Sequence, residues 1–384
     1  MRVTTLDREV EALRPAEEAS TGRSVSLPEV EPWPRPVSGD ELLNDLAAVI
    51  RRHVVVAAAA ADVVAAWALH TWVFERFAHR PRLAVTSPLK RCGKSTLLEL
   101  LRLLCRRPLK ADSISASGVF RTVEALSPVT LLIDEADTFL KDNEELRGVL
   151  NSGFERSGEV IRVVEIRDEH RPVKFRTFAP VAIAAIKAIP GTIEDRSIPI
   201  SMQLRGANEH VEKLRAPGAR ERLAELASKA ARWAADRTAY LNEDPPVPDA
   251  LGDREGDVSV CLLAIADDAG GAWPERVRGG LITLFGRRAA EDRGIDIGAL
   301  LLADIKVIFA ELSATRRPSS EIVDRLGKME HRPGSEWNAG RPMSAPRLAR
   351  ALAPFGVRPG TIRTGAGANQ RGHYREAFEE AWER

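Results

Sequence analysis

One loop constrains this chain more than any other feature, because a Gly-Lys-Ser triplet follows a short apolar run and leads into another. Leu83–Val85 predicts a buried strand, and Leu97–Leu101 predicts a helix. A tight loop between them can wrap a polyphosphate with backbone N–H groups, since the helix dipole favours negative charge at a helix N-terminus. We therefore predict nucleotide binding by the loop residues Ser87, Pro88, Leu89, Lys90, Arg91, Cys92, Gly93, Lys94, Ser95 and Thr96.

Two members of this loop have specific predicted roles. Lys94 is expected to reach the β- and γ-phosphates as a catalytic residue, and the Ser95 hydroxyl is expected to bind Mg²⁺. The usual pattern is G-x-x-x-x-G-K-[ST], and Pro88 stands here at the first glycine position. Proline has a fixed negative φ and no N–H, so the loop must enter by another backbone path. The alternative interpretation is a Gly-Lys-Ser helix start that binds no ligand.

A second motif follows the apolar run Val129–Ile133, which is typical of a buried parallel strand. Catalytic groups of open α/β sheets lie just beyond the carboxyl ends of such strands. We predict that Asp134 holds Mg²⁺ and that Glu135 orients or deprotonates the attacking water. We expect both acids to converge with Lys94 on one metal-bound triphosphate, across the tips of neighbouring strands. An exposed acidic turn after a core strand is the alternative.

The composition limits what kind of protein this chain can be. The 384 residues suggest two or three domains, and 44% hydrophobic with 29% charged residues favours packed cores. Because the net charge is +1, a nucleic-acid site must be a local patch. Cys92, Cys105 and Cys261 show no pairing pattern or metal-ligand spacing, which fits a reducing cytoplasm. No signal peptide is predicted. The run Val54–Leu69 is interrupted by Asp62 and does not predict a membrane span. We predict buried helices instead, one from Gly39 to about His53 and a second from about Ala57 to Phe77, with His70 and Trp72 as packing residues.

An arginine near position 200 is a third candidate catalytic residue. Phe175–Ala185 predicts a core strand, and Lys187 is the nearest polar residue after it. Arg196 then stands in a short turn before another predicted strand, the usual place for a charge donated to the γ-phosphate of a neighbouring copy. An ion pair within the chain, for example with Glu194, is the alternative.

The order of these motifs resembles that of AAA+ ATPases. In detail the chain is more similar to a P-loop domain family of unknown function found in actinobacterial, plasmid and phage proteins, which often accompanies primase or helicase modules. The resemblance covers about residues 65–205. It rests on His70–Trp72, the loop from Ser87 to Ser95, Leu131–Asp137, Asn143–Arg147 with Asn151, and Asp195–Ile200. It implies ATP binding and hydrolysis in a homo-oligomeric ring such as a hexamer. AAA+ proteins usually place an Asn or Thr sensor where Lys187 stands.

The last segment predicts a small separate domain. Ile297–Leu312, Ser319–Leu326 and Ser344–Leu352 predict helices, and strands around Gly365–Gln370 predict a hairpin, which together make a winged helix-turn-helix. No acid occurs between Gly340 and Arg375. The arginines predicted to contact DNA are Arg347, Arg350, Arg363, Arg371 and Arg375. The third helix would enter the major groove. A solvated basic face or a protein-binding winged helix is the alternative.

The predicted fold is α/β, with a P-loop NTPase (AAA+-like) parallel-sheet core, a helical lid and a C-terminal winged helix. The predicted parts are a polar Pro-rich tail at 1–37, the ATPase core with leading helices at 38–205, the lid at 206–292 and the winged-helix domain at 296–384. Arg220 and Arg222 are weak candidates for a lid arginine.

The predicted function is that of a cytoplasmic Mg-ATP-hydrolysing ATPase acting on DNA. It would be a replicative helicase or helicase-like motor of a mobile element or phage, with a primase or replication protein as a candidate partner. The alternative is a nucleotide-gated DNA-binding or loading switch, and a small-molecule P-loop kinase is a weaker third reading. A pore loop with basic or aromatic residues would favour the motor, and the candidate segments are 156–162 and 167–174.

Overall fold

The computed structural model describes residues 25–27, 29–87, 89–166, 168–186, 189–203, 205, 209–311, 315–329, 343–363 and 369–383. The predicted tail at 1–37 therefore lies largely outside the described residues. The chain divides into two units, Met1–Leu281 and Ile282–Arg384, and each is described by itself. None of the helices in the described ranges is long and apolar enough to cross a membrane.

A five-stranded parallel sheet forms the centre of the first unit. Its strands, in sheet order, are β2 (Pro108–Ala111), β3 (Thr130–Ile133), β6 (Val181–Ile186), β1 (Arg82–Ser87) and β7 (Ser197–Ser201). Leu83 of β1 lies opposite Ala182 of β6 and Ile198 of β7. Because all five strands run the same way, their ends gather along one border, here called the carboxyl edge, and their starts along the other, the amino edge. The predicted α/β class is confirmed.

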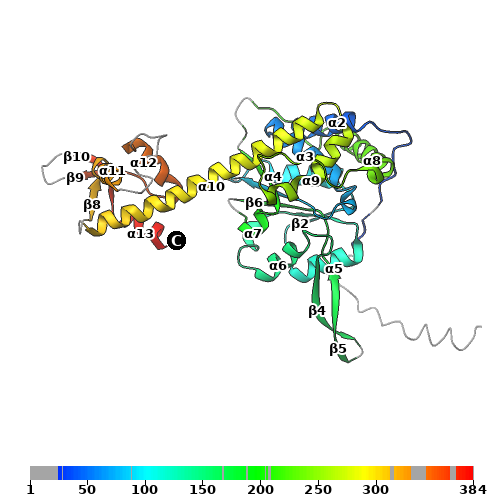
Figure 1. Ribbon diagram of the computed structural model, residues 1–384, viewed down its shortest axis with the longest axis horizontal. Helices are drawn as coiled ribbons and strands as arrows, with labels where there is room; N and C mark the ends of the chain where they lie inside the picture. Colours follow the sequence, from blue (N-terminus) through cyan, green and yellow to red (C-terminus); the bar gives the residue numbers. More distant parts are fainter. Residues whose placement is uncertain are drawn as a thin grey trace, which may run out of the picture. The chain divides into compact units, whose positions relative to one another are not determined.

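Helices cover both faces of this sheet (Figure 1). One face carries α2 (Gly39–His53), α3 (Ala58–His70), α4 (Lys94–Leu104) and α8 (Ala219–Arg237), and the other carries α5 (Ala116–Leu126), α6 (Glu144–Ser152) and α7 (Gly191–Glu194). The first unit also contains α9 (Asp253–Ala269), the start of α10 (Trp273–Glu311), and the short helices η1 (Phe74–Arg76), η2 (Ala136–Thr138) and η3 (Thr238–Tyr240).

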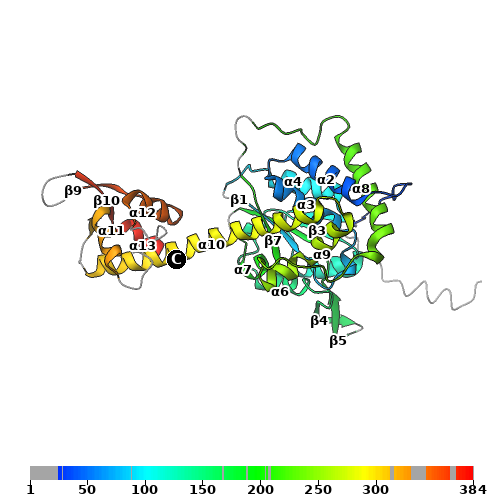
Figure 2. The same cartoon turned by 45° about the horizontal axis from the view of Figure 1, so that its top comes forward.

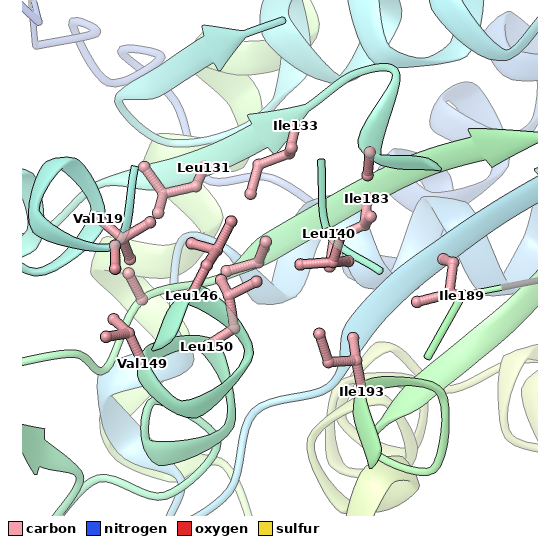
Figure 3. Close-up of a cluster of buried hydrophobic side chains, with 14 of the residues drawn as sticks. Val119, Leu131, Ile133, Leu140, Leu146, Val149, Leu150, Ile183, Ile189 and Ile193 are labelled. Atoms are coloured by element: carbon pink, nitrogen blue, oxygen red, sulfur yellow. The ribbon is translucent and has the colours of Figure 1, made fainter. Parts of the chain in front are cut away.

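The core under α5 and α6 holds the strand ends in place. Leu131 and Ile133 of β3 pack with Ile183 of β6 against Val119 of α5 and Leu146 of α6 (Figure 3). Burying one such side chain contributes about 1.5–3 kcal/mol. Several such contacts therefore hold in place the carboxyl end of β3, which leads into the acidic motif.

A two-stranded hairpin projects from this unit (Figures 1 and 2), with Val160 and Phe175 at its base packed against the core. Its strands are β4 (Glu159–Ile166) and β5 (Glu169–Arg176), with Val163 opposite Pro172. The segment 167–174, which was a candidate pore loop, lies mostly in β5. The predicted strand Phe175–Ala185 is also wrong in extent, because β5 ends at Arg176 and β6 begins five residues later, after Pro180.

The predicted buried helix is confirmed, but it ends earlier along the chain than expected. The expectation extended it to Phe77, but α3 ends at His70 and η1 follows. His70 is fully buried and its Nδ1 lies 2.6 Å from the Trp67 carbonyl oxygen. Trp72 Nε1 donates to the Leu104 carbonyl oxygen at 3.0 Å. Both are packing residues, as predicted.

The second unit combines the end of α10 with a three-stranded antiparallel sheet and short helices. The sheet order is β8 (Arg316–Pro318), β10 (Asn369–Tyr374), β9 (Gly360–Arg363), and the helices are α11 (Ser319–Lys328), α12 (Ala345–Leu352), η5 (Ala353–Phe355) and α13 (Glu376–Glu383). The helix predicted at Ile297–Leu312 is wrong as a separate element, because α10 is continuous from Trp273 to Glu311. The residues between the predicted lid, which ends at 292, and Ile297 hold no proline and one glycine. A single glycine costs a helix only about 1 kcal/mol.

Candidate active site

A glycine with positive φ forms the start of α4. Gly93 is the N-cap of this helix with φ 88°, and Arg91 has φ 66°. An L side chain at position 93 would be strained, and its Cβ would lie 3.4 Å from Met202 Cε. The first backbone N–H groups of α4, from Lys94 onward, have no partners within the helix. The predicted strand, loop and helix are confirmed, whereas Pro88 lies outside the described residues.

Lys94 folds back across this loop to the end of β1. Its Nζ donates to Ser87 Oγ at 2.6 Å, and Ser87 Oγ donates to the Leu89 carbonyl oxygen at 2.7 Å. Cys92 Sγ lies 3.3 Å from the same carbonyl oxygen and donates to it. The loop is thus closed by its own polar groups, with the Lys94 ammonium at the carboxyl edge of the sheet. Ser95 and Thr96 lie in the first turn of α4.

The acidic motif lies directly beyond β3. Asp134 is buried, and its Oδ1 accepts the Glu135 N–H at 3.0 Å. Glu135 is exposed and has a left-handed backbone with φ 51°. Lys110 Nζ lies 3.4 Å from both Asp134 Oδ2 and Asp112 Oδ1. Burial lowers the pKa of Lys110, but attraction to Asp134 and Asp112 outweighs it and leaves the pKa above its ordinary value. Asp134 therefore lies in a site that already favours a cation.

The lysine and the acids lie at the same edge but not on adjacent strands. β6 lies between β1 and β3, so the expectation of neighbouring strand tips was wrong. Two strand spacings put the tips about 10 Å apart. The end of β6 is tied to the acidic motif by Asp137, whose Oδ1 accepts the Ile186 N–H at 2.8 Å. Lys187, the residue at the predicted sensor position, lies outside the described residues.

Arg196 lies at the opposite edge of the sheet from Lys94. It immediately precedes β7, and its carbonyl oxygen accepts the N–H of Arg82, the first residue of β1, at 3.2 Å. Its Nη1 donates to the Thr192 carbonyl oxygen at 2.9 Å. Since the five steps of β1 span about 17 Å, Arg196 is remote from the loop of its own chain.

Two buried arginines lie beside Arg196. Arg80 and Arg82 are 1% and 0% exposed, and each donates to a backbone carbonyl oxygen, that of Thr177 and that of Leu150 respectively. Burial lowers the pKa of both guanidinium groups, that of Arg82 to about 9 with a further contribution from Arg196. Sequence reasoning missed this pair, because nothing local shows that two arginines at a strand start will be buried.

A polar clasp connects the end of α2 with the predicted lid. Glu212 donates its N–H to the Arg52 carbonyl oxygen at 2.8 Å, and its own carbonyl oxygen lies 2.7 Å from His53 Nδ1. The Glu212 carboxylate pairs with Arg222 of α8 at 2.5 Å. Arg220, the other predicted lid arginine, lies 3.9 Å from a carboxylate oxygen of Glu99 on α4. Both lid arginines thus pair with carboxylates of their own chain.

A cavity of about 340 Å³ opens beside the loop. It is lined by His53, Val54, Val55, Arg91, Cys92, Gly93, Thr96, Gln203, Arg205 and Val211. These residues come from the end of α2, from the loop with the first turn of α4, and from the segment after β7. Sequence reasoning identified the loop but not the two other walls, because their residues carry no motif.

The five arginines predicted to contact DNA lie in the second unit and are exposed. Arg347 and Arg350 are on α12, Arg363 ends β9, Arg371 lies in β10 and Arg375 follows it. Arg363 lies opposite Asn369, and Arg371 lies opposite Thr361, so these two arginines share one face of the β9–β10 hairpin. The predicted short helices and hairpin strands are confirmed, while the hairpin turn at 364–368 lies outside the described residues.

Comparison with known proteins gives a family but no activity. A family model described as "Protein of unknown function (DUF3631)" matches residues 201–384, which lies C-terminal to the stretch that carried the resemblance in the sequence. An "Uncharacterized 28.9 kDa protein in xis 5'region" of Saccharopolyspora erythraea is 30% identical over 186 residues, 48% of this chain and 68% of that protein.

Solved structures add only a weak likeness. Two apo structures of the NrS-1 C-terminal region align with 92% of this chain and 79% of theirs, at 12% identity. Their TM-scores are 0.35 and 0.32. Scores this low do not establish a common fold.

Proposed function

This chain belongs to the family described as "Protein of unknown function (DUF3631)", and from that premise we propose that it is an AAA+-like P-loop ATPase that hydrolyses Mg-ATP and acts on DNA. The proposed parts are an ATPase core with leading helices at 38–205, a helical lid at 206–292 and a winged-helix domain at 296–384. The proposed role is that of a helicase or helicase-like motor in the replication of a mobile element or phage, in the cytoplasm, with a primase or other replication protein as partner.

The strand order β2-β3-β6-β1-β7 carries this proposal. The strands that lead into the Gly-Lys-Ser loop and into the Asp-Glu pair flank β6, so both motifs lie at one edge. Ligands of open α/β sheets bind outside the carboxyl ends of the strands. A triphosphate whose β-phosphate lies on the loop, near Lys94, would direct its γ-phosphate across β6 toward Asp134 and Glu135.

The groups at this edge fit Mg²⁺. Ser95 and Asp134 would hold it, and Mg²⁺ takes oxygen ligands and needs only one or two carboxylates besides the substrate phosphates. The Lys110 ammonium at 3.4 Å from Asp134 supports this fit, since it marks a place where positive charge is favoured. No group of three or more His, Cys, Asp or Glu that could hold a metal occurs in the described part of the chain. When bound, the ion would neutralise charge on the phosphates.

The remaining roles belong to the chain itself. The Lys94 ammonium would leave Ser87 and bind the β- and γ-phosphates, together with backbone N–H groups of residues 91–96. Glu135 would accept a proton from the attacking water, since its carboxylate stands exposed beside the buried Asp134. Arg196 would act on the nucleotide of a neighbouring copy, because about 17 Å of strand separates it from its own loop. A homo-oligomeric ring, such as a hexamer, follows from that role.

Contact with DNA is proposed for the second unit. The order of α11, α12, β9 and β10 fits a winged helix in which α12 would enter the major groove. Arg347 and Arg350 on α12 and Arg363, Arg371 and Arg375 on the hairpin would bind phosphates. Each phosphate that an arginine neutralises makes the slope of log affinity against log salt about 0.9 more negative.

A nucleotide-gated switch that binds or loads DNA without translocation remains the second candidate. The β4–β5 hairpin is the element that would line a pore, and one face of it exposes the aliphatic residues Ile161 and Val163, which are 60% and 66% exposed. Lys174 and Pro172 lie opposite them on the same face. Glu159 and Arg176 continue this face toward the base of the hairpin, and Glu165 and His170 continue it toward the tip. The face therefore has mixed charge and no Phe, Tyr or Trp, which favours the switch over a motor that grips DNA by a basic or stacking surface.

ATP turnover with and without DNA tests the proposal. We expect Mg²⁺-dependent hydrolysis that single- or double-stranded DNA stimulates, and loss of turnover in Lys94→Ala. We expect Arg347→Ala with Arg350→Ala to lose the stimulation while DNA-free turnover stays unchanged. An absence of turnover and nucleotide binding in the wild type would overturn the proposal. Strand displacement on a forked duplex separates motor from switch, because only a motor displaces the strand.

A further inference from the structure

A fixed aromatic ring lies at the amino edge of the sheet. Phe154 follows α6 and is 1% exposed. The Arg80 N–H donates to its carbonyl oxygen at 3.1 Å, and its own N–H donates to the Asn151 carbonyl oxygen at 3.2 Å. Gly153 allows the chain to approach this closely, because a Cβ there would overlap the Thr177 carbonyl oxygen. Packing and backbone hydrogen bonds therefore hold the ring in one place.

Two arginines from separate segments converge on this ring. The Cζ atom of Arg196 lies 5.9 Å from the ring centroid, and that of Arg254 lies 5.8 Å from it. Arg196 immediately precedes β7, whereas Arg254 is the second residue of α9. His79 stacks on the ring with a centroid distance of 5.0 Å, which leaves the opposite face for the two guanidinium groups. Because the face of an aromatic ring attracts cations, Phe154 stabilises two positive charges near each other.

Arg254 is accessible and only weakly paired. Its side chain is 48% exposed, and its Nη1 lies 3.6 Å from Oδ2 of Asp257, whose side chain is 44% exposed. Ion pairs with such exposure contribute little to stability. A cation in the first turn of a helix is also unfavourable, because the helix dipole favours negative charge there. The stability of α9 therefore gives little reason for an arginine at this position, and Arg254 can exchange Asp257 for a stronger anion.

We propose that Arg254 acts together with Arg196 on the triphosphate of a neighbouring copy, as a second arginine that this chain contributes to its neighbour's nucleotide site. Because both guanidinium groups lie within 5.9 Å of one centroid, a single extended anion can meet both. Arg254 would leave Asp257 and donate to phosphate oxygens, whose charge strengthens each hydrogen bond. The inference rests on the proposed function, because it needs Arg196 to face a neighbouring nucleotide.

ATP turnover of four variants tests this role. We expect Arg254→Ala to lower turnover about tenfold, the effect of one hydrogen bond to a charged group, and Arg254→Lys to keep part of the loss from occurring. Asp257→Asn breaks the same ion pair but leaves the guanidinium group, so it should keep wild-type turnover. Arg232→Ala is the matched control, since Arg232 pairs with Asp236 of its own helix. If Asp257→Asn is as slow as Arg254→Ala, Arg254 serves its own helix and the inference is overturned.

Mixtures of variants locate Arg254 on the same side of the shared site as Arg196. Arg254→Ala mixed with Lys94→Ala should exceed the average turnover of the two, because some sites combine the loop of the first with both arginines of the second. Arg254→Ala mixed with Arg196→Ala should not exceed their average, because every site then lacks one arginine. An excess in this second mixture would mean that Arg254 acts on the nucleotide of its own chain, which overturns the inference.

Association of the full chain gives a readout without hydrolysis. Sedimentation velocity is measured with Mg²⁺ and adenylyl imidodiphosphate, an ATP analogue that resists hydrolysis. We expect Arg254→Ala to need about tenfold more protein than the wild type to associate. Wild-type association of Arg254→Ala, with weakened association of Arg196→Ala, overturns the inference and leaves the proposed function standing. A wild type that neither binds nor hydrolyses nucleotide overturns both.

Discussion

At the carboxyl edge of the five-stranded sheet, charged groups meet partners from their own chain. Lys94 donates to Ser87, and Lys110 lies 3.4 Å from Asp134. At the amino edge, the buried Arg80 and Arg82 lie beside Arg196, and the side chains of the first two donate to backbone carbonyl oxygens. Neither of them forms an ion pair within the described residues. The carboxyl edge thus pairs Lys110 with a carboxylate, whereas Arg80 and Arg82 at the amino edge bind only neutral oxygens among the described residues.

The difference fits a division of labour between copies. A buried charge without a counter-charge is costly, so a fold that keeps two beside a partly exposed arginine gains from an anion brought by another molecule. The triphosphate at the carboxyl edge of a neighbouring copy would be such an anion. Under the proposed function the two edges would be two halves of one site, and each can be altered separately.

Loss of Arg196 should have the largest effect. We expect Arg196→Ala to lower the ATP turnover of the assembled protein about 10³-fold, the effect of removing an arginine that acts on the transferred phosphate. Arg121→Ala, an exposed arginine on α5, should leave turnover unchanged. Mixing Arg196→Ala with Lys94→Ala should restore activity, because the second variant lends its arginine to the nucleotide site of the first. If mixing restores nothing, the two edges do not belong to one shared site.

A substitution at the carboxyl edge should impair the nucleotide site of the chain that carries it. We expect Glu135→Gln to lower turnover about 100-fold while ATP binding is retained, because proton transfer is lost and the phosphate contacts are kept. Glu144→Gln, an exposed acid at the start of α6, is the matched control. Mixing Glu135→Gln with Arg196→Ala restores activity only at sites where the base comes from one chain and the arginine from another. Turnover by Glu135→Gln at the wild-type rate would remove Glu135 from the site.

The buried groups near the amino edge should also make stability depend on pH. Burial lowers the pKa of His70 to about 3, with a further lowering by Arg80 that a hydrogen bond to Trp67 partly opposes. Between pH 6.5 and 3 the unfolded chain thus binds a proton that the folded chain does not, so stability falls as the pH falls. At pH 5 this amounts to about 2 kcal/mol relative to pH 7.

Urea unfolding at pH 7 and pH 5 measures this contribution. The loss of stability between the two pH values should be about 2 kcal/mol smaller in His70→Asn than in the wild type. His210→Asn, which changes an exposed histidine, should keep the wild-type difference. The same pH dependence in His70→Asn and the wild type would show that His70 is not held neutral by its surroundings.

Local signals predicted much of this site. The Gly-Lys-Ser loop and the Asp-Glu pair each follow an apolar run, so their place at strand ends could be inferred without the structure. The position of β6 between them could not, because strand order depends on pairing rather than on any local pattern. The continuity of α10 was missed as well, because the prediction began a separate helix and domain near Ile297, where α10 has no break.

Contacts between distant segments were the least predictable part. His53 meets Glu212 across 159 positions in the chain, and neither residue belongs to a motif. Arg80 and Arg82 carry no local signal of burial, yet the fold buries both of them. Lys110 reaches Asp134 because β2 pairs with β3 in a register that sets Lys110 opposite Leu132. In each case the relevant neighbour is chosen by packing.

Lys110 offers the most specific test of the carboxyl edge, with the smallest expected effect. Its ammonium compensates Asp134 in this structure, so a metal ion at Asp134 would have to share that carboxylate with it. We expect Lys110→Met to bind Mg²⁺ about threefold more tightly in the presence of ADP, the size of effect that one partly exposed ion pair permits. Lys141→Met, a lysine near the acidic motif but outside these pairs, should have no effect. Weaker Mg²⁺ binding in Lys110→Met would mean that Lys110 holds Asp134 in place for the ion rather than competing with it, and the carboxyl edge would then be organised by its lysine rather than merely neutralised.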